Sequence, residues 1–152
     1  METHPKAFRF TAAAVLAAGL ILATASLSPR SGLAQTADQR SAVVAVIESQ
    51  LQAFRQNDGS GAYRHAAPNI RDMFGTVDVF MDMVRRGYGF LIDPAVVEFL
   101  DVKAEGADLL QAVRVIGRDG TRKIAIYRME RQADGSWKIA GVYITEDPQA
   151  AV

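Results

Sequence analysis

The sequence contains no cysteine, and His65 is its one histidine outside the first ten residues. Without thiols the chain can form no disulfide, no thiolate nucleophile and no cysteine-ligated metal site. A zinc or haem site would then depend on one imidazole and scattered carboxylates, so we expect no cofactor and no metal. These absences exclude thiol chemistry and argue against a metal-dependent enzyme.

The sequence also lacks any excess of charge of one sign. Lysine and arginine number 17, aspartate and glutamate also number 17, and no run of basic residues occurs. A chain without a positive field has nothing that attracts a phosphate backbone, so we expect no nucleic-acid partner. At 152 residues, with 49% hydrophobic and 22% charged residues, it is long enough for one globular domain.

The N-terminus has the pattern of a secretory signal. Lys6 and Arg9 precede residues 11–27, which carry no charge. Gly32 and Ala34 then place small residues before a cleavage site.

We predict a signal peptide over residues 1–34, cleaved after Ala34, and one domain over residues 35–152. The mature protein would be periplasmic or secreted. A weaker alternative cut follows residues 23–25, and an uncleaved segment would instead attach the protein to the membrane.

Four helical segments are expected before any strand. Apolar residues at three- and four-residue steps predict an amphipathic helix that begins at a cap on Asp38 and ends near residues 58–59. A short helix fits residues 61–67, closed by Pro68. Asn69 can cap a single turn, and Thr76 can cap a fourth helix that ends near residue 87.

Four β-rich runs follow, and they predict an antiparallel meander. They cover residues 96–104, 109–117, 122–130 and 136–144. Asp119-Gly120 and Asp134-Gly135 are tight-turn signals between them, and residues 90–92 could form a fifth short strand. Helices followed by such a sheet predict an α+β fold in which the helices pack on one sheet face.

The strands are apolar on both faces. Strict alternation would place Trp137, Ile139, Gly141 and Tyr143 on one face of the last strand and residues 138, 140, 142 and 144 on the other. Because the helices can cover one face only, we expect a homodimer through the second face, with Val142 as a candidate interface residue. The alternative is a strongly curved sheet wrapped by its own termini.

Several stretches in combination resemble a family of short exported bacterial proteins catalogued as domain of unknown function 4864. The resemblance covers about residues 40–146 and is carried by IESQLQAF, AYRHAAPNIRDMFGTVDVFMDMVRRGY, LLQAVRVIG and YRMERQADGSWKIAGV. It implies the cystatin-like cone of the nuclear transport factor 2-like superfamily, in which three helices and a curved four- or five-stranded antiparallel sheet enclose a pocket. That superfamily includes enzymes, ligand carriers and interaction modules.

His65 invites a catalytic reading because its side chain titrates near neutral pH. A helix over residues 61–67 would turn it away from the apolar face, so we expect no catalytic role.

Five other residues combine an apolar body with a polar group, which is typical of a small-molecule pocket. They are Tyr63, Tyr88, Gln111, Tyr127 and Trp137. The alternative for each is a core residue whose polar atom bonds to backbone. We expect noncatalytic binding of a small apolar ligand or a partner protein. The alternative is a cofactor-free lyase or isomerase that pairs a tyrosine with an acid such as Asp101.

Overall fold

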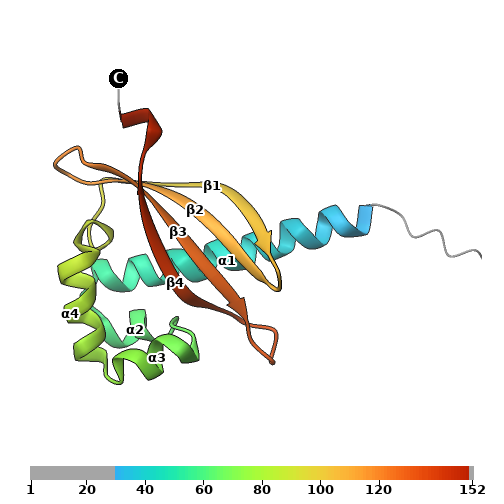
Figure 1. The fold of residues 1–152 in the computed structure, drawn as a ribbon, viewed down its shortest axis with the longest axis horizontal. Helices are drawn as coiled ribbons and strands as arrows, with labels where there is room; N and C mark the ends of the chain where they lie inside the picture. The colour runs from blue at the N-terminus through green and yellow to red at the C-terminus, as the bar shows by residue number, and fades with distance from the viewer. Residues whose placement is uncertain (1–29, 151–152) are drawn as a thin grey trace, which may run out of the picture.

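The computed structural model describes residues 30–150, with the side chains of residues 36–149. Helices come first and an antiparallel sheet follows, which confirms the predicted α+β class (Figure 1). The helical elements are α1 (Arg30–Arg55), α2 (Gly59–Tyr63), α3 (Pro68–Phe74), α4 (Val77–Gly87) and the 3-10 turns η1 (Gly89–Leu91) and η2 (Pro148–Ala150). The strands are β1 (Val96–Glu105), β2 (Asp108–Ile116), β3 (Arg122–Arg131) and β4 (Trp137–Glu146).

The predicted signal peptide lies largely outside the described residues. The expected cleavage point, after Ala34, falls near the beginning of α1, and cleavage there stays a prediction. Within residues 30–150, no helix is both long enough and apolar enough to cross a membrane.

Helix α1 carries the predicted apolar stripe. Val43, Ile47, Leu51 and Phe54 are all buried. The predicted cap at Asp38 is wrong, because α1 runs from Arg30 through this residue without a proline or other break.

The end of α1 also differs from the prediction, since the helix ends at Arg55 and not near residues 58–59. Asp58 instead caps α2, where its carboxylate accepts a hydrogen bond of 2.8 Å from the Gly61 amide. A Cβ atom at Gly61 would lie 2.2 Å from that carboxylate, so this cap requires glycine.

The segment between α2 and α3 departs from the predicted helix. Helix α2 ends at Tyr63, and residues 65–67 pair with β4 as a parallel bridge. The Ala67 amide donates to the Ile139 carbonyl at 2.9 Å, and the Ile139 amide donates to the His65 carbonyl at 2.8 Å. These long-range bonds replace the helical ones that sequence periodicity suggested.

The caps of the next two helices give one correction and one confirmation. Helix α3 begins at Pro68, so Asn69 lies inside it and does not cap it. The Asn69 side chain instead donates to the Ala140 carbonyl at 3.0 Å. Thr76 caps α4 as predicted, because its hydroxyl accepts a hydrogen bond from the Val79 amide.

The sheet has four strands in the order β1-β2-β3-β4, all antiparallel, within the described part of the chain. Gly120 and Gly135 adopt φ values of +83° and +84° in the predicted hairpin turns, a conformation that favours glycine. Residues 90–92 do not add a fifth strand. Most of them form the turn η1, since the chain must reverse between α4 and β1.

The predicted alternation of β4 is wrong beyond Ile139. Arg128 pairs with Gly141, while Met129 pairs with Ile139, so Ala140 is an extra residue in a β-bulge. The inserted residue shifts the pleat, and Val142 therefore joins Trp137 and Ile139 on the helix-covered face, where it packs against the core. Val142 is consequently the wrong residue for testing an interface on the open face.

One core lies between the helices and the covered sheet face. Its central side chains include Ile47 and Leu51 of α1 with Val113, Tyr127 and Met129 of the sheet, all 2% exposed or less. Helix α1 runs across the back of the sheet, and α2, α3 and α4 gather beside the first half of β4 (Figure 1). The short helices therefore face the edge strand of the sheet.

The chain after β4 is fixed by an ion pair on the open side of the sheet. The Arg114 guanidinium lies 2.8 Å from Asp147 and 2.7 Å from Glu98. Burial opposes ionisation of Asp147, but hydrogen bonds from the Gln149 amide and from Arg114 lower the pKa of this carboxyl below its ordinary value.

Replacing Arg114 should weaken the fold in a pH-dependent way. Because the folded-state pKa of Asp147 is lowered, its stabilisation is present above its unfolded pKa of about 3.9 and is lost as the pH falls through the folded value. Urea midpoints of Arg114→Met should lie below wild type near pH 7, and the gap should narrow near pH 3. Arg118→Met is the control, because the Arg118–Asp93 pair is exposed. A gap independent of pH would contradict this role.

Candidate functional site

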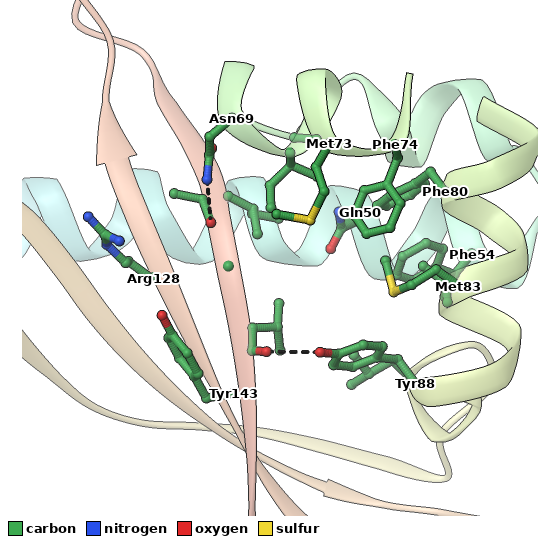
Figure 2. Close-up of a pocket in the computed structure, with 18 residues that line it drawn as sticks. Gln50, Phe54, Asn69, Met73, Phe74, Phe80, Met83, Tyr88, Arg128 and Tyr143 are labelled. Atoms are coloured by element: carbon green, nitrogen blue, oxygen red, sulfur yellow. Dashed lines mark hydrogen bonds between the residues drawn. The ribbon is translucent and has the colours of Figure 1, made fainter. Parts of the chain in front are cut away.

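A cavity of about 370 Å³ lies between edge strand β4 and helices α3 and α4, with α1 behind it (Figure 2). This volume is at the lower end of the roughly 300–1,000 Å³ of small-molecule sites. The helical part of the chain, from α1 to η1 with its connecting segments, contributes Gln50, Phe54, Ala66, Asn69, Ile70, Met73, Phe74, Phe80, Met83, Val84, Tyr88 and Leu91. The sheet contributes Arg128, Ile139, Ala140, Gly141, Val142 and Tyr143.

The strand side of the cavity is held by hydrogen bonds to three carbonyls of β4. The Ile139 carbonyl accepts from the Ala67 amide, and the Ala140 carbonyl accepts from Asn69. The Tyr88 hydroxyl donates to the Val142 carbonyl at 3.2 Å. Edge carbonyls that would otherwise be free are thereby satisfied, and the helices are kept at a fixed distance from the strand.

The helix side of the cavity is aromatic and thioether-rich. Phe80 is the centre of this wall, with its ring centroid 6.5 Å from Phe54 and 6.0 Å from Phe74. Met83 lies beside these rings, and Met73 is 70% exposed at the mouth. Flexible methionine side chains adapt to different apolar shapes, so this wall can accommodate ligands of varied outline.

The polar end of the site lies across β4 from the aromatic wall. Arg128 and Tyr143 project there, and the Tyr143 hydroxyl points toward Arg128 (Figure 2). Asp108 accepts a hydrogen bond of 2.6 Å from Arg128 Nε. Asp108 first, and Tyr143 to a lesser extent, raise the pKa of Arg128, so its positive charge is permanent.

Comparison with known families decides where the chain belongs. The family model described as Domain of unknown function (DUF4864) matches residues 36–152. The chain belongs to this family. The match includes every residue that lines the cavity, from Gln50 to Tyr143. Among curated proteins, none matches the chain.

Of the five pocket residues predicted from the sequence, Tyr88 lines the cavity and the other four do not. Tyr63 lies behind the wall, with its ring 5.1 Å from Phe80 and its hydroxyl donating to the Arg71 carbonyl. Trp137 is 7% exposed beneath Arg131, whose guanidinium lies 5.9 Å from the ring. Tyr63 therefore has the role that was the alternative reading, and Trp137 is a buried residue of the core.

Gln111 and Tyr127 form a buried polar pair on adjacent strands of the core face. Their Cα positions are paired across β2 and β3, and both residues are 0% exposed. Gln111 Nε2 donates to the Leu100 and Ala112 carbonyls, but Gln111 Oε1 and the Tyr127 hydroxyl have no partner among the described residues. Burial raises the pKa of Tyr127, so its phenol stays neutral.

The residues considered for acid-base chemistry lie away from the cavity. Asp101 is exposed on β1, at the far edge of the sheet, and does not line the cavity. His65 is half-buried near β4. Burial first, and then Lys138 and Arg64, lower its pKa below the ordinary value. Both backbone groups of His65 are hydrogen-bonded, since its amide donates to the Ala62 carbonyl and its carbonyl accepts from the Ile139 amide.

Arg71 explains the local sequence around His65 in structural terms. Its guanidinium donates to the Ala66 carbonyl at 3.1 Å and to the Arg64 carbonyl at 2.9 Å, and it lies over the Tyr63 ring. Lys138 also donates to the Arg64 carbonyl. The stretch from Tyr63 to Arg71 therefore holds the turn before α3 in place, and its charged residues serve that turn.

Sequence reasoning missed most of the cavity wall. Met73 and Met83 lie on helix faces that periodicity alone cannot assign to a cavity. The predicted alternation assigned Tyr143 to the wrong face of β4, because it did not include the bulge. One available signal was Tyr143 two residues after Gly141, an aromatic residue close in sequence to a position without a side chain. Among the described residues, no group of three or more potential metal ligands occurs.

The Tyr127 hydroxyl should contribute nothing to stability. Tyr127→Phe removes a buried hydroxyl that has no partner among the described residues, so the free energy of unfolding should stay unchanged or rise by up to about 1 kcal/mol. Tyr88→Phe is the matched control and should lose about 1 kcal/mol, because it removes the bond to Val142. Urea denaturation measures both. A loss above about 1 kcal/mol for Tyr127→Phe would reveal a partner for this hydroxyl.

Proposed function

We propose that the chain is an exported, noncatalytic binding protein that takes a small apolar ligand in the cavity between β4 and helices α3 and α4. The observation that supports it is the wall itself, in which apolar and aromatic side chains predominate and a few polar groups converge. This composition is that of ligand sites in general. Export, which we inferred from residues 1–34, belongs to the same proposal. Mass spectrometry of protein recovered from the producing cells tests it by identifying the N-terminal residue.

Binding is favoured over turnover by the chemistry of the wall. Its titratable side chains are Tyr88, Arg128 and Tyr143, and it includes no carboxylate or imidazole. An isomerase or lyase without a cofactor needs a group that can carry a proton near neutral pH. Asp101, the acid considered from the sequence, lies on the opposite edge of the sheet.

We also propose that the family belongs to the nuclear transport factor 2-like superfamily. The support is that its helices precede a curved antiparallel sheet.

A thermal-shift screen of small apolar metabolites tests the proposed site. A ligand at about 100 times its Kd should stabilise the wild type by about 2.7 kcal/mol. Met83→Trp should abolish this stabilisation, because the larger ring occupies the cavity from α4. Val79→Trp is the matched control on the same helix, since Val79 is 52% exposed and does not line the cavity. Stabilisation that survives Met83→Trp, or a screen without any stabilising compound, would contradict the proposal.

A homodimer through the open sheet face is a second part of the proposal. Leu110, Ala112, Ile116 and Ile126 are partly exposed on this face, and none belongs to the core. Near these side chains, the charge of Arg114 is already paired with Glu98 and Asp147. A second copy can therefore approach without strong repulsion between like charges.

Light scattering at micromolar concentrations should give the mass of a dimer. Ala112→Lys should convert it to a monomer while circular dichroism stays unchanged, because Ala112 lies near the middle of the open face, opposite Ile126, and a lysine there can reach solvent in the monomer. Val142→Asp does not test this interface, since Val142 lies on the core face. A monomer mass for the wild type would refute the dimer.

A further inference from the structure

The cavity continues across the edge strand at the bulge. Its wall includes the apolar side chains on the helix side of β4 together with Arg128 and Tyr143, which lie across the strand (Figure 2). Gly141, directly paired with Arg128, lies between these two parts. The site therefore has an apolar end and a charged end on either side of one glycine.

Gly141 has no side chain, so the backbone between the two ends of the cavity is uncovered. A Cβ atom built at this residue would meet nothing closer than the Tyr143 side chain, at 3.8 Å. A ligand chain can thus cross the strand over the bare backbone, with the Tyr143 ring beside it. Any larger side chain at this position would stand in that path.

Arg128 retains hydrogen-bonding capacity for a ligand. A guanidinium has five N–H donors. Asp108 engages Nε and Nη2 through a single oxygen, Oδ2, which lies 2.6 Å from each. The Arg128 side chain is 41% exposed, so a ligand can reach its remaining donors. The Tyr143 hydroxyl adds a further donor at this end.

We propose that the ligand is a single-chain amphiphile with an anionic oxyacid head, either a carboxylate or a phosphate. Its alkyl tail lies among Phe74, Phe80 and Met83, and its head binds Arg128 and the Tyr143 hydroxyl. Arginine suits both heads because its planar fork of donors matches their oxygens. This inference rests on the proposed function, since it assigns the ligand class of the same cavity.

Three octyl compounds with the same tail separate the contribution of the head from that of the tail. Octanoate, octyl phosphate and 1-octanol are titrated into the full mature protein by calorimetry, each below its micelle concentration. At least one anionic compound should bind about tenfold more tightly than octanol, as expected for a charge-assisted hydrogen bond. The comparison of octanoate with octyl phosphate identifies which head is preferred.

Two variants assign the preference to Arg128. Arg128→Gln should abolish the advantage of the anionic compounds and leave octanol binding unchanged. Arg122→Gln is the matched control, because Arg122 lies on the same face of β3, is exposed, and does not line the cavity. Asp108→Asn should strengthen binding of the anions alone, since it removes the carboxylate that competes for Arg128.

The outcomes separate the two proposals. Equal binding of all three compounds, unaffected by Arg128→Gln, would overturn the anionic head and leave the apolar site intact. Anion binding that is lost equally in Arg122→Gln would show a general effect of charge and would also overturn it. If no octyl compound binds but the metabolite screen finds a neutral ligand, the amphiphile is wrong and the cavity stands. If neither experiment finds a ligand, the proposed function itself fails.

Discussion

The site depends on the pairing of residues 65–67 with edge strand β4. Two backbone hydrogen bonds join this segment to Ile139, and Asn69 adds a third bond, to Ala140. Together they cover the part of the edge where an unpaired strand would expose its amides and carbonyls. Because Pro68 begins α3 directly after the paired segment, the same bonds determine where α3 lies. The aromatic wall therefore takes its position from the sheet edge as well as from the helix core.

The bulge at Ala140 gives the cavity its two chemical ends. Without the inserted residue, Tyr143 would share the core face with Trp137 and Ile139, and Val142 would point to the open side. The shift instead places Val142 against the helices and moves Tyr143 toward Arg128. Bulges commonly redirect side chains in this way next to functional sites. Here both redirected residues line the cavity.

Much of the fold could be predicted from the sequence because its signals are local. Periodicity identified α1 and α4, and the Asp-Gly turns identified two hairpins. The bulge could not be predicted, since an alternation pattern assumes that every residue has a partner and Ala140 has none. The helix expected over residues 61–67 failed for a related reason: its end is set by bonds to Ile139, more than 70 residues later. The cavity is built from these two long-range features, so its wall was largely missed.

The covered face of the sheet and the proposed site have separate roles, since the first is packed core and the second is a cavity. Tyr127 was selected from the sequence as a pocket residue because it combines an apolar body with a polar group. Its side chain instead fills the centre, next to Gln111 and Met129, all three without exposed surface. Close packing there stabilises the sheet but leaves no room for a ligand. The cavity lies instead at the edge of the sheet, where the short helices meet the bulged strand.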